Sequence, residues 1–167
     1  MADMSINSLK NSLTNPAREY LWEILFANPK GGDTETLMLR ARSSVIPGRS
    51  VGVIAVPYKQ NAPIQYPGKV AFSHSFPCTF IEGEDREMWN AFYDWAQSII
   101  NVETGIGTPN VKTDLYMNLL DTDGTTSLKI KVVGCFIKEQ SDITVTYEGE
   151  KAIEISIVWS YDYWVKS

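Results

Sequence analysis

Residues 153–165 read IEISIVWSYDYWV, and this stretch decides the fold class. Every second position from Ile153 to Val165 is apolar or aromatic, whereas most positions between them are polar or charged. That alternation is typical of a strand with one buried face. A strand of about a dozen residues exceeds the usual ~5–6. We therefore expect it to extend beyond one compact sheet.

Outward from this stretch, the rest of the chain also has the character of a mainly β protein. Strand-like patterns occur at residues 20–27, 36–42, 70–81, 115–120, 128–132 and 143–147. The first two are predicted to form a hairpin around the turn at 28–33, because proline and glycine favour a change of direction there. The Asp123-Gly124 pair predicts a second hairpin between 115–120 and 128–132. Gly134 lies inside an apolar run and indicates a bulge.

One segment has the periodicity of a convincing helix, residues 85–100. Met88, Phe92, Trp95 and Ile99 follow one another at spacings of four, three and four, which gives an apolar stripe for packing on a sheet. Residues 101–110 then form a glycine-rich loop. We expect one domain over residues 16–167.

Two further segments are predicted to lie outside the core. Residues 1–15 form a polar N-terminal arm in which Ile6, Leu9 and Leu13 permit a short amphipathic helix, too short to be stable alone. A frayed terminus is the alternative interpretation. Residues 46–67 contain several prolines, which exclude a central strand and favour a projecting loop or hairpin.

Composition excludes several classes of function. The net charge is −5, the pI is about 4.9, and no cluster of lysine and arginine exceeds Arg40-Ala-Arg42, so gripping of nucleic acid by its phosphates is not expected. Cys78 and Cys135 are interpreted as free thiols in apolar surroundings and not as a disulfide. Neither a signal peptide nor a membrane-spanning segment is predicted, and a cytoplasm-like compartment is expected.

Motifs for catalysis or cofactor binding are weak. His74 is the only histidine, so it alone could anchor a nucleophilic triad or a metal site, and an ordinary sheet histidine is the favoured interpretation. The run Asp121-Thr-Asp-Gly124 lacks the glutamate that a calcium loop needs at its twelfth position, which is Val132. Gly105-Ile-Gly107 lacks the third glycine of a dinucleotide fingerprint. We expect no enzyme activity, no cofactor and no metal.

Several segments in sequence order resemble the tail tube proteins of contractile-tailed bacteriophages. They are the aromatic strand at Pro16–Phe26, the run RARSSVIPG at 40–48, the strand at 70–81, the helix with its Asp94-Trp95 pair, Gly134, and the ending Asp162-Tyr-Trp164. Together they cover roughly residues 16–166 of the chain. The arm and the loop around Gly105 match no pattern of the family.

The resemblance implies two packed antiparallel sheets, a β-sandwich or barrel-like fold, with one flanking helix. It implies hexameric rings whose strands join into a continuous inner barrel, and stacking of rings into a tube inside a contractile sheath. The implied partners are further copies of the chain, the sheath protein, the baseplate or hub, and the tail terminator. DNA would pass through the lumen without specific binding. The expected location is the tail of the virion, assembled in the host cytoplasm.

Candidate contact residues follow from the arm, the projecting segment and the C-terminal strand. Candidates for contacts between subunits or rings are Ile6, Leu9, Ile46, Pro47, Gly48, Val53, Ile54, Tyr58, Tyr66, Asp162, Tyr163 and Trp164. Candidates for the channel wall are Arg40, Arg42, Lys69 and Ser73. An acidic lumen would repel DNA phosphates, and two inward arginines fit that picture poorly.

Three alternatives remain open at this point. A tube of a phage-derived contractile injection system would carry protein effectors in place of DNA. A free-standing β-sandwich binding module would be a monomer with an aromatic groove on one sheet. A small hydrolase would depend on His74 or on the acidic turns.

Overall fold

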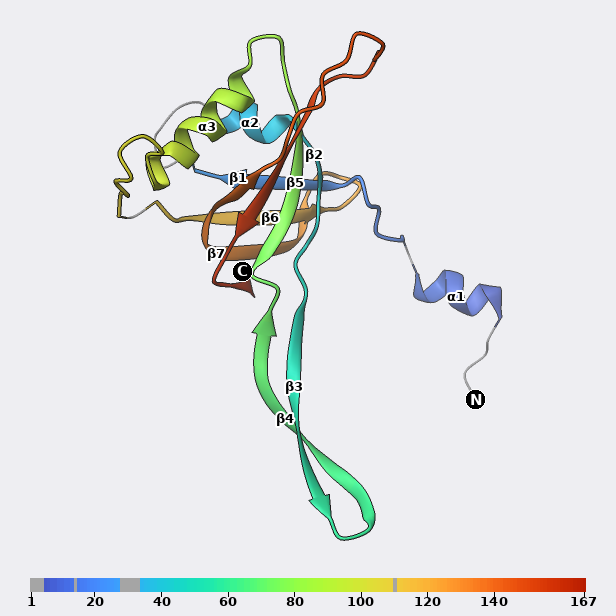
Figure 1. Cartoon of the computed structure of the whole chain (residues 1–167). Coiled ribbons are helices and arrows are strands. Elements are labelled where there is room, and N and C mark those ends of the chain that lie inside the picture. Colours follow the sequence, from blue (N-terminus) through green and yellow to red (C-terminus); the bar gives the residue numbers. More distant parts are fainter. Residues whose placement is uncertain (1–4, 14, 28–33, 110) are drawn as a thin grey trace.

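The computed structural model describes residues 5–13, 15–27, 34–109 and 111–167 (Figure 1). Its helices are α1 (Ile6–Ser12), α2 (Thr34–Leu39) and α3 (Glu87–Ile99). Its strands are β1 (Trp22–Phe26), β2 (Ala41–Ser44), β3 (Arg49–Tyr58), β4 (Asn61–Phe72), β5 (Ser75–Ile81), β6 (Thr113–Leu120), β7 (Thr126–Gln140), β8 (Glu154–Ser160) and β9 (Tyr163–Lys166).

The strands of the body form two antiparallel sheets that share β7. The first sheet pairs β1 with β6, β6 with the first part of β7, and β7 with β9. The second sheet pairs the last part of β7 with β8, β8 with β5, and β5 with β2. The strand order along this path is β1-β6-β7-β8-β5-β2. The predicted mainly β fold, with antiparallel sheets and a helix beside them, is confirmed.

A corner built from Gly134 and Asp162 lets the chain pass from one sheet to the other. Gly134 has φ +70°, and a Cβ there would lie 2.2 Å from Oδ2 of Asp162, so this position requires glycine. The Asp162 N–H donates to the carbonyl of Val133, and Lys112 donates to the Asp162 carboxylate at 2.8 Å. The bend predicted at Gly134 is confirmed.

The core lies between the two sheets and under α3. Trp159 of β8 contacts the rings of Phe26 and Trp95, with centroids 5.6 Å and 5.1 Å away. Met88, Phe92 and Trp95 of α3 are all buried, as the predicted helical stripe requires. The aromatic enrichment of the sequence is therefore used to a large extent inside a single chain.

The hairpin of β3 and β4 leaves this body as a long two-stranded ribbon (Figure 1). The hairpin spans Arg49–Phe72, so it contains most of the segment expected to project, residues 46–67, whereas Ile46, Pro47 and Gly48 precede it. Prolines occur within it because each strand of a two-stranded ribbon is an edge strand, where a missing N–H costs little.

Two predictions about the first half of the chain were wrong. Residues 34–39 form helix α2, so the expected strand at 36–42 and its hairpin with 20–27 do not exist; only Ala41–Ser44 is extended, and it pairs with β5. The expected strand at 70–81 is broken at His74, whose φ is +55°, into the end of β4 and the whole of β5. The turn expected at 28–33 lies outside the described residues.

Two predictions about the second half were also wrong. Residues 143–147 form no strand. The long strand expected from Ile153 to Val165 is divided at Tyr161 and Asp162 into β8 and β9, which belong to different sheets. The alternation holds through Tyr161, which is buried, whereas Tyr163 is exposed beyond the corner. The other hairpin, β6 and β7 around Gly124, is confirmed.

Candidate assembly surfaces

The projecting hairpin exposes an unusual amount of apolar surface. Every residue of β3 is exposed, and β4 is exposed over most of its length. The large apolar side chains at least 44% exposed in it are Val51, Val53, Ile54, Val56, Tyr58, Ile64, Tyr66 and Val70. Two-stranded hairpins are marginally stable in water without packing. A contiguous apolar surface of this kind marks an interaction site.

The register concentrates large side chains on one face of the ribbon. Ile54 pairs with Tyr66 and Val56 pairs with Ile64, so these four side chains point to the same side. The alternating positions on the other side include Ala55 paired with Gln65. The distal half of the hairpin therefore has one strongly apolar face and one less apolar face, which we call the weaker face.

The root of the hairpin is held by Trp164 of β9. Its indole Nε1 donates to the carbonyl of Gly48 at 3.4 Å. The ring of Phe72 contacts it edge-on at 6.2 Å, and the Arg49 guanidinium lies 5.8 Å from its centroid. Trp164 therefore sets where the ribbon leaves the body.

A second contact at the root involves the break between β4 and β5. His74 Nδ1 lies 3.1 Å from the carbonyl oxygen of Tyr161, which requires that this nitrogen carry the proton. The hydroxyls of Ser73 and Tyr161 are 3.0 Å apart. His74 therefore makes a structural contact at the break between β4 and β5, and it lies outside both strands, not within a sheet as the favoured interpretation predicted.

The outward face of the second sheet carries small hydroxyl side chains. Thr79 pairs with Ser156 and Ser75 pairs with Ser160 across β5 and β8, on the side opposite the buried positions. Arg42 and Glu154 form an ion pair on the same face. This face therefore mixes hydroxyl side chains with Pro77, Val158 and Ile81, and Arg42 on it is paired with Glu154.

Among the residues that the structure describes, neither border of the second sheet has a further partner strand. β2 pairs only with β5, and the last part of β7, from Phe136 to Gln140, pairs only with β8. Because neighbouring strands alternate in direction along β7-β8-β5-β2, these two borders run antiparallel to each other. Open borders of this kind can pair with another copy.

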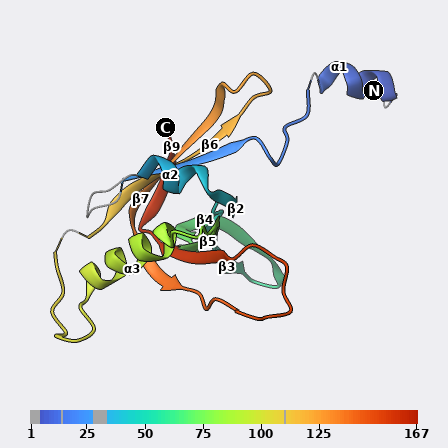
Figure 2. The same ribbon diagram turned by 90° about the horizontal axis from the view of Figure 1, so that it is seen from above.

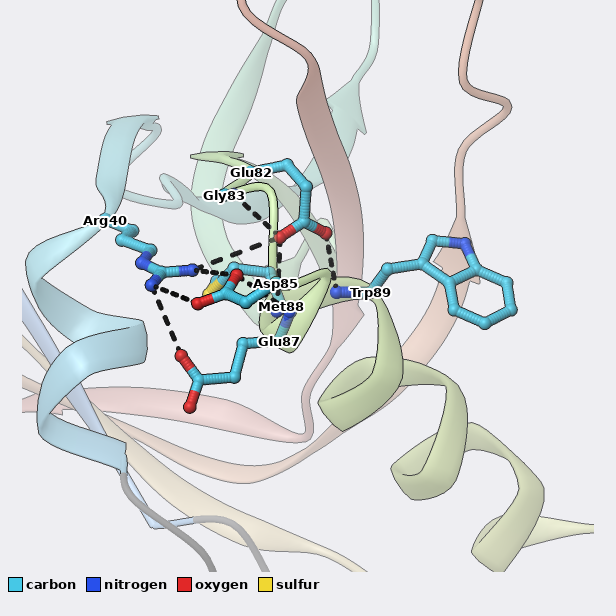
Figure 3. Close-up of polar contacts among 7 residues, drawn as sticks. All are labelled: Arg40, Glu82, Gly83, Asp85, Glu87, Met88 and Trp89. Carbon is cyan, nitrogen blue, oxygen red and sulfur yellow. Dashed lines mark hydrogen bonds and ion pairs between the residues drawn. The ribbon is translucent and has the colours of Figure 1, made fainter.

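A cluster of charged residues around the buried carboxylate of Glu82 lies at the start of α3 and caps it (Figure 3). Glu82, whose side chain is fully buried, accepts hydrogen bonds from the N–H groups of Gly83, Met88 and Trp89 at 2.9, 3.4 and 2.9 Å. The N-cap residue, Arg86, is left-handed and makes no side-chain cap, so Glu82 takes that role from outside the helix.

Arg40 completes this cluster by contacting three carboxylates. It lies 3.1 Å from Asp85, 3.2 Å from Glu87 and 4.0 Å from Glu82. The hydrogen bond from Arg40 holds the pKa of Asp85 below its usual range. The cluster satisfies helix N–H groups, so we assign it to stability; it borders an open groove of about 590 Å³ that Trp89, Ile143 and Val145 also line.

The two cysteines carry buried thiols that ionise poorly. Burial raises the pKa of Cys78 to about 12, and burial is also the main cause that raises the pKa of Cys135 to about 12. Both thiols are free. In the part of the chain that the structure describes, no group of three or more histidine, cysteine or acidic residues has the geometry to hold a metal ion. Within the same residues, no helix has both the length and the apolar character to cross a membrane.

The structure places the predicted contact residues in three regions. Ile6 and Leu9 are exposed on α1; Val53, Ile54, Tyr58 and Tyr66 are exposed on the hairpin; and Ile46, Gly48, Asp162, Tyr163 and Trp164 lie around its root and the neighbouring corner. Pro47 differs, because it is buried within its own chain.

The predicted channel-wall residues are not brought together. Arg42 lies on the outward face of the second sheet, Ser73 lies at the break before β5, and Lys69 lies in the hairpin. The grouping of Arg40 with Arg42 was wrong, because α2 replaces the expected strand and directs Arg40 to the carboxylates beside α3. The hydroxyl residues of β5 and β8 were missed; their alternation with buried aromatics is the signal for them.

Comparisons by sequence identify no relative. No family model matches the chain, and no curated protein matches it. The fold, by contrast, has clear counterparts among solved structures.

The fold is similar to those of chains in solved tube assemblies. A chain in an extracellular contractile injection system, the PVC sheath-tube complex in its extended state, superposes with a TM-score of 0.69 at 13% identity over 99% of both chains. A chain of the anti-feeding prophage tube-terminating cap gives 0.69 at 12% identity, over 92% of this chain and 91% of the other. The SPP1 tail tube gives 0.53 at 18% identity, over 91% and 79%. The predicted resemblance to tube proteins is confirmed at the level of fold.

Proposed function

We propose that this protein is the subunit of a tail tube, assembled from rings of identical copies that stack around a continuous channel. The observation that carries the proposal is the β3–β4 hairpin, whose apolar side chains are exposed throughout in the isolated chain. A hairpin that leaves its own body and exposes isoleucine, valine and tyrosine needs another surface to cover it. The shared fold with tube components supports that reading.

Ring closure is assigned to the two open borders of the second sheet. β2 of one copy would pair antiparallel with the last part of β7 of the next, and six copies would close the sheet into a barrel. Closure removes both open borders of the second sheet at once, which is the physical reason for a ring in place of an indefinite chain.

The channel wall is assigned to the outward face of that sheet. Its hydroxyl side chains, with Arg42 neutralised by Glu154, offer a surface without a strong field of either sign. This assignment replaces the expected strongly acidic lumen with a neutral wall on this sheet. A cargo would slide past such a wall without a strong electrostatic trap.

Stacking is assigned to the apolar face of the hairpin, Ile54, Val56, Ile64 and Tyr66, which would pack against an adjacent ring. The sheath, the baseplate and the tube terminator are the further partners proposed, since solved structures that share the fold come from a sheath-tube complex, a sheath/tube terminator and a baseplate. The place of action is then a phage tail or an injection tube.

Two cargoes are compatible with a tube. Delivery of a phage genome inside a contractile sheath is our first proposal. Delivery of protein by a phage-derived injection system is the second, and the fold shared with a chain of an extracellular contractile injection system supports it. The neutral wall does not discriminate between them.

The experiment compares the unmodified chain with a hairpin variant, Ile54→Glu together with Tyr66→Glu. We expect the unmodified chain to sediment as rings or longer assemblies at high concentration. The variant is expected to retain its far-ultraviolet circular dichroism and to lose stacking, because two carboxylates would enter the apolar contact. As a matched control, Gln65→Glu alters the weaker face and should stack normally. A variant that stacks like the parent would refute the role of the hairpin.

A further inference from the structure

We infer that helix α1 of one copy docks into a groove on the neighbouring copy, between β2 and the β1–β6 pair. This inference rests on the proposed function, because it takes the neighbour to be an adjacent copy in the ring. The occupant is a defined segment, the arm helix Ile6–Ser12 with Leu13 at its end.

The arm helix cannot be stable as an isolated element. It has seven residues, and none of them is buried. Ile6, Leu9 and Leu13 are 70, 56 and 52% exposed, at the spacing of one helical face. Figures 1 and 2 both show α1 standing apart from the body at the end of an extended linker. A helix this short needs external packing to persist.

The linker is anchored in a way that directs the arm outward. Asn15 donates through its side chain to the hydroxyl of Thr122 at 2.9 Å, in the turn between β6 and β7. Leu21 accepts a backbone hydrogen bond from Leu120 at 2.9 Å. Because the linker is held at both points, a return of α1 to the groove of its own chain would require a reversal beside Asn15. A second copy is the occupant that needs no such reversal.

The groove has a volume of about 440 Å³ and opens beside the free border of β2. Trp22, Ile46, Met117 and Leu119 supply its apolar lining. The groove lies beside the border of β2, to which ring closure assigns the adjacent copy.

The polar groups of the groove complement those of the arm. Asn118 is 5% exposed and lines the groove; its Nδ2 donates to Glu23 at 2.7 Å, but its Oδ1 has no hydrogen-bond partner. A buried acceptor without a partner is costly and requires a donor. Glu19 and Glu23 add two carboxylates at the same groove, and Arg42, which is ion-paired with Glu154, also lines it.

The arm supplies the matching chemistry. Lys10 lies in the last turn of α1, next to Leu9 and four residues after Ile6. An ammonium group carries three donors, enough for the orphan oxygen of Asn118 and a carboxylate. The stripe of Ile6, Leu9 and Leu13 would fill the apolar lining. The apolar stripe and Lys10 of the arm thus match the apolar lining and the oxygen acceptors of the groove.

Cross-linking between two distinguishable full-length chains tests this inference. One chain carries Lys10→Cys, and the other carries Glu19→Cys and a size tag; a short bismaleimide is the probe. The native thiols do not interfere, because both are buried with pKa values raised to about 12. We expect a tagged–untagged product, and we expect none when the second chain carries Glu103→Cys, an exposed control position.

Each other outcome overturns the inference. A double variant, Lys10→Cys with Glu19→Cys, that cross-links only within one chain at high dilution would show the arm in its own groove. Assembled tubes without any tagged–untagged product would refute the docking and leave the proposed function intact, whereas the absence of any assembly would refute the proposed function itself.

Charge reversal gives an independent readout on full chains. Lys10→Glu should raise the concentration needed for assembly roughly twofold to fivefold, the effect expected from one exposed ion pair. Adding Glu19→Lys should restore it, whereas adding Glu103→Lys should not. If Glu19→Lys does not restore assembly of the Lys10→Glu variant, or if Glu103→Lys restores it equally well, the pairing of Lys10 with Glu19 is contradicted.

Discussion

Replacement of Glu82 by alanine should destabilise the whole domain, although Glu82 belongs to no helix or strand. Its carboxylate accepts three N–H groups at the start of α3 and lies 4.0 Å from Arg40 (Figure 3). Since Met88, Phe92 and Trp95 of α3 are part of the core, loosening the first turn of the helix affects the central packing.

The magnitude follows from the contacts that are lost. A helix cap is worth about 1 kcal/mol, and hydrogen bonds to a charged group are worth about 1.5–3 kcal/mol. These terms overlap, so we expect Glu82→Ala to cost about 2–4 kcal/mol of unfolding free energy. Glu82→Gln retains one acceptor oxygen without the charge, and about half of that loss is expected.

Urea denaturation followed by tryptophan fluorescence measures these values at neutral pH. The matched control is Glu84→Ala, an exposed acidic residue two positions further on, for which a change within about 0.5 kcal/mol is expected. If Glu82→Ala lost no more stability than Glu84→Ala, the carboxylate would not cap α3 and the reasoning would be refuted.

Three further predictions concern the corner, the acid limb of stability and the thiols. Gly134→Ala should lower the free energy of unfolding, measured by thermal denaturation, by about 2–4 kcal/mol, because φ is +70° and Asp162 leaves no room for a Cβ. Gly105→Ala is the control: its φ is +69° but the space around it is open, so a loss of only about 1–2 kcal/mol is expected. Lys131 lowers the pKa of Asp114, so this pair stabilises the fold above the ordinary carboxyl pKa of about 3.9 and loses that effect as pH falls below it. Asp114→Asn should therefore flatten the acid limb of the curve of unfolding free energy against pH. An unchanged acid limb would contradict this. The two cysteines should resist iodoacetamide at pH 8 in the native state and react in urea, since both thiols are buried with raised pKa values; rapid native labelling would refute their burial.

The sequence predicts the parts of the fold in which periodicity reflects burial. The stripe of α3 and the alternation of Ile155, Ile157 and Trp159 are visible in sequence because each side chain of the repeat enters one core. The Asp-Gly turn before β7 is visible because local backbone preference decides it.

The errors arise where local patterns are ambiguous or tertiary structure prevails. The run at 36–42 alternates like a strand, but it is short enough to fit either element, and Leu39 is 81% exposed. The breaks at His74 and Asp162 depend on contacts with Tyr161 and Lys112, which are remote in sequence. No local signal marks them.

The candidate surfaces divide in the same way. Val53, Ile54 and Tyr66 could be predicted as contact residues because apolar side chains stand among prolines in a segment that cannot be a central strand. The groove beside β2 could not, because it is formed by residues 19–23, 42–46 and 117–119, which only the fold brings together.

Electron microscopy of the purified, unmodified chain at high concentration tests most directly whether copies of this protein complete one another's sheets. We predict rings with sixfold symmetry and a central channel, stacked into tubes, with the β5–β8 face toward the channel. Particles that remain monomeric at every concentration, with the borders of β2 and β7 still unpaired, would contradict the account.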